Sequence, residues 1–282
     1  MNIFASLFGR QSVKGCRKES IIPKIEVANF QGIGKRPEQE DSFYVSDFTD
    51  SKLLREKGFL AVVADGMGGL ANGAEMSAMI TGVAKNYFEK QKITKYASEE
   101  DECLYLKGFL AAVREEAKRI SSEEEDGEKG STIVAIWMKG ENMYLLSVGD
   151  SRIYLQRGEG LYQMTRDHNL YSKLAERMAK GELSKAEFED ISGKAGLTSF
   201  IGLSNQEYVD VSERAFNLKE GDKILLFTDG VFGTLSEQEI VQVCMEEKSE
   251  LIAKNLRIMI EEINGKRQDN YTGVIISYKG RR

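Results

Sequence analysis

The order of strand-like and helix-like segments predicts a mixed α/β (α+β) fold, in which largely antiparallel sheets are flanked by helices. Strand-like segments follow one another in adjacent pairs, and helical stretches come in pairs of their own. This order differs from the strict alternation of strands and helices that accompanies a parallel sheet. The chain has 282 residues, of which 41% are hydrophobic, so it can bury a sizeable core.

Nine segments are apolar and rich in β-branched and aromatic residues, as is typical of strands. Between two of them, Gly149-Asp150-Ser151 is a turn sequence, and we predict that it closes a hairpin. The nine predicted strands cover residues 24–34, 42–48, 59–64, 131–138, 143–148, 152–157, 207–212, 223–228 and 271–278.

Helices are predicted where apolar residues recur at intervals of three and four. Ser236 with Glu239 has the spacing of a capping box, and Ser184 with Glu187 predicts the start of a further short helix. The longer predicted helices cover residues 73–91, 100–122, 237–247 and 249–264.

Composition restricts the classes of partner and cofactor. A formal net charge of −6 and a pI near 5.2 argue against a nucleic-acid partner, which would require a basic face. The three cysteines lie far apart, so they match neither a zinc motif nor a disulfide framework, and they favour a reducing cytoplasm. Because there is one histidine, a metal site must consist mainly of oxygen ligands, which favours Mg²⁺ or Mn²⁺.

Residues 1–22 are predicted to form a disordered N-terminal extension, followed by one domain over residues 23–282. The apolar start of the extension is too short and too interrupted for a signal peptide or an integral membrane segment. A weak anchor at a membrane surface is the alternative interpretation.

Two aspartates stand where apolar strands end. Asp65-Gly66 follows the uncharged run 59–64, and Asp229-Gly230 follows the apolar run 223–228. Asp-Gly is also a common turn, as Asp126-Gly127 illustrates within a charged loop. A carboxylate directly after a buried strand requires compensation, however, because burying it unpaired costs several kcal/mol.

Further acidic residues lie next to other predicted strands, namely Glu40 and Asp41, Asp150, and Asp269. Each has a surface or turn interpretation when it is taken alone. Together they predict a cluster at one edge of the sheets. Two carboxylates about 4 Å apart repel by about 4 kcal/mol at an effective dielectric near 20, so the cluster must take up protons or divalent cations.

Seven motifs in a fixed order resemble the metal-dependent protein phosphatases of the PPM family (protein phosphatase type 2C), especially the bacterial single-domain type. The resemblance covers about residues 25–278, nearly the whole chain. The motifs are Arg36…Glu40-Asp41, VVADGMGG (62–69), GSTIVA (130–135), SVGDSR (147–152), TRDH (165–168), LLFTDG (225–230) and DNYT (269–272).

This resemblance implies a four-layer sandwich, with two antiparallel β-sheets flanked by pairs of α-helices and a flap subdomain at about residues 172–195. It implies that Asp65 bridges two metal ions, that the Gly66 carbonyl binds one of them, and that Asp229 and Asp269 bind the other. Asp150 corresponds to a ligand of a third, weaker metal ion.

The catalytic roles carried over from the family are three. Glu40 and Asp41 hold metal-bound waters, and Asp41 orients the nucleophile. Arg36 binds the substrate phosphate, for which a planar guanidinium is suited. Gly233 stands where relatives often supply a second ligand to the third metal, and His168 is expected to order a loop rather than to act as the acid.

The implied reaction is hydrolysis of phosphoserine or phosphothreonine by a water that two Mn²⁺ or Mg²⁺ ions activate, without a phosphoenzyme. The implied partners are phosphorylated proteins, substrates of a Ser/Thr kinase, in the cytoplasm. Two alternatives stay open. One is a non-catalytic phosphopeptide-binding relative, and the other is a two-metal nuclease or nucleotide hydrolase.

Overall fold

The computed structural model describes residues 21–67, 72–90, 99–122, 129–203, 206, 208–263 and 265–281. Residues 1–20 of the predicted N-terminal extension lie outside these ranges. No helix in the described ranges is both long and apolar enough to cross a membrane.

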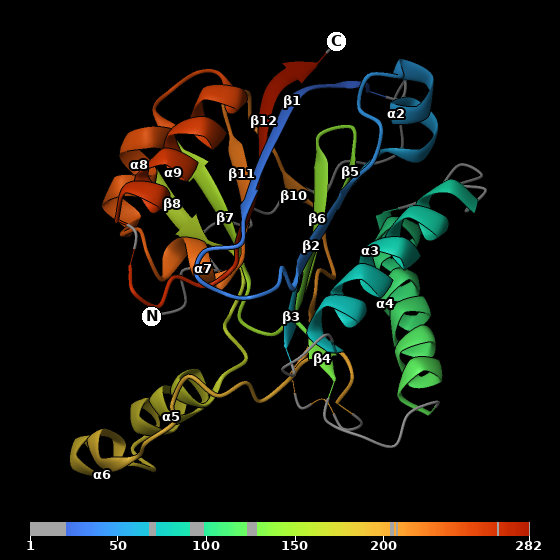
Figure 1. The fold of residues 1–282 in the computed structure, drawn as a ribbon. Helices are drawn as coiled ribbons and strands as arrows, with labels where there is room; N and C mark the ends of the chain where they lie inside the picture. Colours follow the sequence, from blue (N-terminus) through green and yellow to red (C-terminus); the bar gives the residue numbers. More distant parts are fainter. Residues whose placement is uncertain are drawn as a thin grey trace.

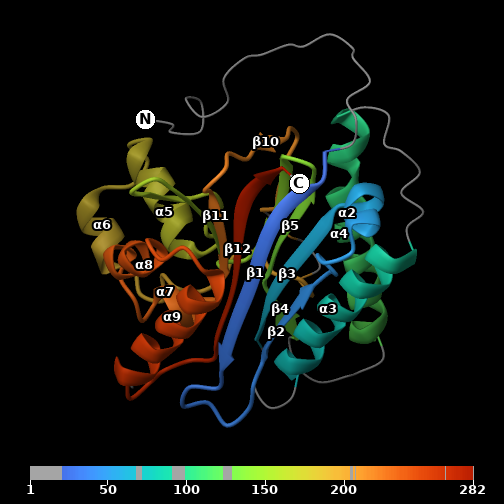
Figure 2. The same cartoon turned by 90° about the horizontal axis from the view of Figure 1, so that it is seen from above.

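The strands form two antiparallel sheets (Figures 1 and 2). They are β1 (Pro23–Gly32), β2 (Asp41–Val45), β3 (Phe59–Met67), β4 (Gly130–Ser131), β5 (Ile133–Lys139), β6 (Asn142–Val148), β7 (Arg152–Arg157), β8 (Gly160–Gln163), β9 (Asp210–Val211), β10 (Phe216–Asn217), β11 (Lys223–Phe227) and β12 (Tyr271–Arg281). The first sheet has the order β1-β12-β11-β7-β8. The second has the order β10-β6-β5-β3-β2, to which β4 adds beside β3 and β9 beside β6.

Helices cover the outer face of each sheet, which confirms the predicted four-layer sandwich (Figure 1). The first sheet is covered by α8 and α9, and the second by α3 and α4. A pair of helices, α5 and α6, projects from the sandwich within the predicted flap. The helices are α2 (Ser51–Lys57), α3 (Asn72–Lys90), α4 (Glu99–Ser122), α5 (Leu170–Ala179), α6 (Lys185–Asp190), α7 (Asp229–Phe232), α8 (Glu237–Cys244) and α9 (Ser249–Ile263).

Strand β3 shows why its sequence is apolar throughout. Side chains alternate across a strand, so Leu60 and Val62 pack under α3 and α4, whereas Ala61 and Val63 pack between the two sheets. Both faces are buried, and the strand therefore carries no polar residue until it reaches Asp65.

Both predicted capping boxes are present. The Ser236 side chain accepts the Glu239 backbone N–H at the start of α8, and Glu239 reaches back to the Ser236 backbone N–H. Ser184 and Glu187 make the same exchange at the start of α6. The predicted helix starts are therefore confirmed.

The predicted hairpin across residues 143–157 is wrong. Both strands form, but β6 pairs with β5 in the second sheet, whereas β7 pairs with β11 and β8 in the first. Gly149 adopts a φ of 107°, and the chain crosses from one sheet to the other at this turn. A turn sequence reports local geometry and does not specify the partner of either strand.

Two other strand predictions need smaller corrections. The segment 131–138 is divided into β4 and β5 at Thr132, and among the described residues of the segment 207–212 only Asp210 and Val211 form a strand.

Candidate active site

The expected site residues lie where strands of both sheets begin and end at one edge of the sandwich. In the second sheet, Asp41 at the start of β2 pairs with Asp65 near the end of β3. In the first sheet, β11 runs antiparallel to β12, so Asp229 just after β11 and Asp269 just before β12 emerge at the same edge. The crossing turn brings Asp150 to this edge as well.

Asp65 lies at the centre of the charge cluster. Desolvation raises its pKa well above the ordinary value, and the charges of Asp41, Asp229, Asp150 and Asp269 raise it further, in that order. These interactions require the five carboxyl groups to be neighbours, as the sequence analysis expected.

The main chain of Asp65 is fixed on both sides. Its N–H donates to Thr132 Oγ1 at 3.1 Å, and its carbonyl accepts the Thr132 N–H at 2.8 Å and the Ser131 hydroxyl at 2.9 Å. The carboxyl group therefore projects from a rigid strand end.

Three neighbouring carboxyl groups are perturbed in the same direction. Desolvation is the largest cause in each case, and it raises the pKa of Asp41 and of Asp150 to about 7. The pKa of Asp229 is raised by desolvation and then by the charge of Asp269, whereas a hydrogen bond with the Asp65 side chain opposes the shift. A carboxyl group with a raised pKa binds a proton more readily than a free side chain does, and a cation can take the place of that proton.

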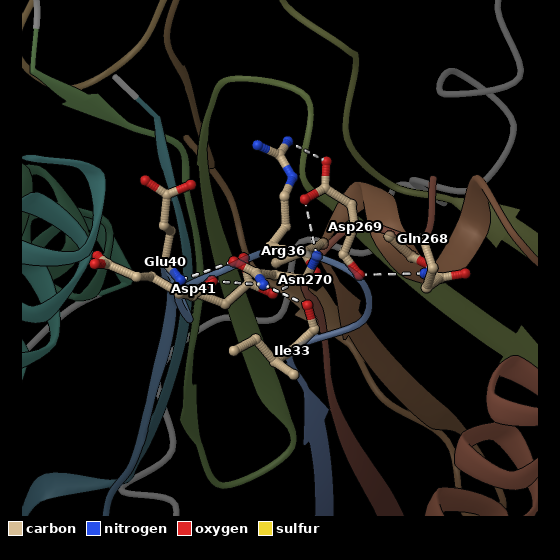
Figure 3. A network of polar contacts seen from close by, with 10 residues as sticks. Ile33, Arg36, Glu40, Asp41, Gln268, Asp269 and Asn270 are labelled. Atoms are coloured by element: carbon tan, nitrogen blue, oxygen red, sulfur yellow. Dashed lines mark hydrogen bonds and ion pairs between the residues drawn. The ribbon is translucent and has the colours of Figure 1, made fainter. Parts of the chain in front are cut away.

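Arg36 lies at the rim of the cluster. Its Nη2 is 2.6 Å from Asp269 Oδ2, and 50% of the Arg36 side chain and 35% of the Asp269 side chain are exposed (Figure 3). The bond to Asp269 raises the pKa of the guanidinium, to which the charges of Glu40 and Asp229 also contribute. A permanently charged donor thus faces solvent beside the carboxylates.

Asn270 is a positioning residue to which the sequence analysis assigned no role. Its Nδ2 donates to the carbonyls of Ile33 at 2.8 Å and Glu38 at 3.0 Å, and its Oδ1 accepts the Glu40 N–H at 2.7 Å (Figure 3). One side chain therefore fixes the loop that carries Arg36 and Glu40. The one sequence signal that pointed to Asn270 was its position in the DNYT motif, residues 269–272.

Gly66 is required by close packing of the main chain. A Cβ atom there would lie 2.2 Å from the Gly73 carbonyl oxygen and 2.6 Å from that of Glu40. The Gly66 N–H donates to the Glu40 carbonyl at 3.1 Å, which ties β3 to the loop before β2. A larger residue would separate Glu40 from Asp65.

The donor set fits hard divalent cations, since it consists of carboxylate and carbonyl oxygens. Asp41 Oδ1 is buried and has no hydrogen-bond partner among the described residues, and desolvation raises the pKa of both Asp41 and Asp65. In the described part of the chain, no three Asp, Glu, His or Cys side chains form a ready-made metal cage. The ion pair with Arg36 engages one of the expected ligands, Asp269.

His168 has the contacts of a residue that orders a loop. Its side chain is fully buried, Nδ1 accepts the Gly149 N–H at 3.2 Å, and Nε2 lies 3.1 Å from Asp210 Oδ2. These contacts join the stem of the flap to the turn that carries Asp150. Gly233 ends α7 and has no side chain to add to a third metal site.

Comparisons with known proteins agree with this architecture. A family model described as Protein phosphatase 2C matches residues 39–258. The serine/threonine phosphatase stp of Listeria monocytogenes serotype 4b is 28% identical over 219 residues, which are 77% of this chain and 83% of that protein.

Solved structures show the same fold. The serine/threonine phosphatase of S. agalactiae superposes with a TM-score of 0.72 at 25% identity, over 90% of this chain and 100% of that one. The catalytic domain of the serine/threonine protein phosphatase PstP, solved with two manganese ions, has a TM-score of 0.69 at 22% identity, over 90% and 97% of the two chains. At that identity, the second likeness concerns the fold alone.

The four-layer sandwich is the fold that this chain shares with these solved structures. The chain belongs to the protein phosphatase 2C family, a metal-dependent class, and is a protein serine/threonine phosphatase.

Proposed function

We propose that this protein hydrolyses phosphoserine and phosphothreonine in phosphorylated proteins, with two Mn²⁺ or Mg²⁺ ions as cofactors and a third ion bound more weakly. The substrates are those of a Ser/Thr kinase, and the enzyme acts in the cytoplasm. One observation carries the proposal. Five aspartates from separate segments, Asp41, Asp65, Asp150, Asp229 and Asp269, meet at one edge of the sandwich. Burial, followed by the charges of neighbouring carboxylates, raises the pKa of the first four.

Each of the cations would be held by its own set of ligands, with Asp65 common to two of them. Asp65 would contact both ions, the Gly66 carbonyl would complete one site, and Asp229 with Asp269 would complete the other. Asp150 would hold the third. When bound, the ions would neutralise the phosphoryl group and activate a water for in-line attack, without a phosphoenzyme.

Arg36 would bind the phosphate of the substrate. Its guanidinium is half-exposed and has two planar N–H edges suited to phosphate oxygens, and its present partner Asp269 would be engaged by a cation. Glu40 and Asp41 would hold waters bound to the cations, and Asp41 would orient the water that attacks.

The domain assignment belongs to the same proposal. Residues 23–282 would form the phosphatase domain, residues 1–22 an extension, and residues 172–195 a flap that contributes to substrate choice. Polar side chains dominate the flap, and Leu174 is the buried residue that α5 and α6 contribute in the structure.

The test is release of phosphate from a phosphothreonine peptide in the presence of Mn²⁺, measured against a phosphotyrosine peptide and against EDTA. We expect rapid release from the phosphothreonine peptide only, and none with EDTA. Asp65→Asn should lower kcat on the order of 100-fold or more, because it removes a charge that both cations need.

The control is Asp47→Asn, the same change at an exposed aspartate outside the site, for which we expect no change in kcat. An Asp65→Asn enzyme with wild-type kcat would contradict the site assignment. Inactive wild-type protein that binds the phosphopeptide would favour the non-catalytic alternative. Release from single-stranded DNA or nucleotides, but not from the peptide, would favour the nuclease or nucleotide hydrolase.

A further inference from the structure

The two oxygens of the Asp41 carboxylate differ in the hydrogen bonds that they accept. Oδ2 accepts hydrogen bonds from the hydroxyls of Thr228, at 3.0 Å, and Thr272, at 2.7 Å. Oδ1 is equally buried, yet it has no hydrogen-bond partner in the described ranges of the chain. The residue as a whole is 4% exposed, so solvent does not make up the difference.

The direction of both hydroxyl bonds follows from their surroundings. Thr272 Oγ1 receives the Gln31 Nε2–H at 3.1 Å, and Thr228 Oγ1 receives the Thr272 backbone N–H at 2.9 Å. Each oxygen thus accepts from an N–H and has its own proton left to donate. Both protons point at Asp41 Oδ2, which acts purely as an acceptor.

Thr228 donates its hydroxyl proton to Asp41 and does not cap the helix that follows it. It is the N-cap residue of α7, where a threonine hydroxyl normally accepts a backbone N–H of the first turn, and here its side chain makes no such bond. An N-cap bond is normally favourable, so the bond to Asp41 replaces a favourable alternative.

The two threonines and Asp41 come from different sheets. Thr272 lies on β12 and Thr228 just after β11, in the first sheet, whereas Asp41 opens β2 in the second. Both threonine side chains are fully buried. The three residues therefore join the two sheets at the edge where the carboxylates meet, and they fix the carboxylate plane relative to both.

We propose that Thr228 and Thr272 are positioning residues. Their hydroxyls occupy Asp41 Oδ2 with hydrogen bonds, which leaves Oδ1 as the single oxygen of this carboxylate that takes part in the reaction. This inference rests on the proposed function and names which atom of Asp41 performs it. A buried carboxylate oxygen without a partner is costly unless a water or a cation takes the position beside it. Holding the group in one orientation avoids reorganisation during the reaction.

The test replaces each threonine by valine, which keeps the shape and removes the hydroxyl, and by serine, which keeps the hydroxyl. We expect Thr228→Val and Thr272→Val each to lower kcat by about 10- to 100-fold, the usual effect of removing a hydrogen-bond partner that orients a group at a metal site, with little change in KM. The serine variants should restore most of kcat. Calorimetry should show a parallel loss of Mn²⁺ affinity in the valine variants.

Ser277→Ala is the matched control. Ser277 also lies on β12 and is buried, and its hydroxyl bonds to the Ser249 hydroxyl at 2.7 Å, away from the carboxylates. We expect it to lower the melting temperature without changing kcat or Mn²⁺ affinity. Folded valine variants with wild-type kcat would overturn the inference, as would serine variants that are as impaired as the valine variants.

A further variant covers the case in which a valine variant does not fold. Asp41→Asn can present its amide oxygen to both hydroxyls and its NH₂ group in place of Oδ1, so it should fold with at least the wild-type melting temperature and lose kcat. A folded Asp41→Asn enzyme with wild-type kcat would overturn the inference. If the threonine variants are unaffected while Asp65→Asn is inactive, only this inference fails. If Asp65→Asn is active as well, the proposed function fails.

Discussion

At the scale of single residues, Asp150 differs from the other carboxyl groups of the cluster in the charged residues that surround it. Its pKa is raised to about 7 by desolvation and by the charges of Asp229 and Asp167, while Arg152 opposes the shift. Gly233, the position from which relatives often supply a second ligand to the third metal, has no side chain. A cation held by Asp150 would therefore have fewer protein ligands than one held by Asp229 and Asp269.

We predict that Asp150→Ala raises the Mn²⁺ concentration needed for half-maximal activity several-fold and lowers kcat less than Asp65→Asn does. The measurement is a metal titration of phosphopeptide hydrolysis beside the wild type. Superimposable titration curves would remove Asp150 from the mechanism.

Some site residues could be recognised from the sequence because their surroundings are local. Asp65 and Asp229 stand out since an apolar strand leads into each of them. Asn270, Thr228 and Thr272 act through partners that are far away in the sequence, and no local pattern reveals which group a buried amide or hydroxyl will contact.

At the scale of secondary structure elements, α6 and α8 both begin with a capping box but differ in how far they pack into the core. The α8 helix begins with the Ser236–Glu239 box and buries Ile240 and Cys244 in the core. The α6 helix begins with the Ser184 box and has no buried residue among its described positions.

We predict that Ser236→Ala lowers the free energy of global unfolding by about 1 kcal/mol, the usual loss for an N-cap. Ser184→Ala should leave global unfolding unchanged, because α6 can open locally without the core. Urea unfolding followed by tryptophan fluorescence measures the first effect, and amide hydrogen exchange in residues 185–190 the second. Equal losses of global stability would show that the flap unfolds together with the sandwich.

The elements themselves were predicted better than their partners. The apolar runs of β3, β11 and β12 and the capping boxes locate strands and helices from neighbours in the sequence. The crossing at Gly149 was mistaken for a hairpin, because pairing of β7 with β11 depends on residues about 70 positions further along the chain.

At the scale of the whole molecule, the carboxylate cluster sets the dependence of stability on pH. The pKa of Asp41 and Asp150 is about 7 in the folded protein against 3.8 for a free side chain, and those of Asp65 and Asp229 are raised as well. Between those values the folded chain retains protons that the unfolded chain has released. The stabilisation is therefore complete below about pH 4 and is lost as the pH rises towards about 7.

We predict that the melting temperature of metal-free protein falls between about pH 4 and about pH 7, and that Mn²⁺ raises it most at the higher pH. Differential scanning calorimetry in EDTA and in excess Mn²⁺ measures both effects. Asp41→Asn should flatten the metal-free profile. A melting temperature that rises over this range without metal would contradict the raised pKa values.

The pairing of β1 with β12 has a consequence for folding during synthesis on the ribosome. Because β12 lies between β1 and β11, the first strand must wait for the last before its sheet can assemble. Asp269 and Thr272 belong to the segment that enters the sheet together with β12. The carboxylate cluster therefore cannot be complete before β12 has been synthesised and has paired with β1 and β11.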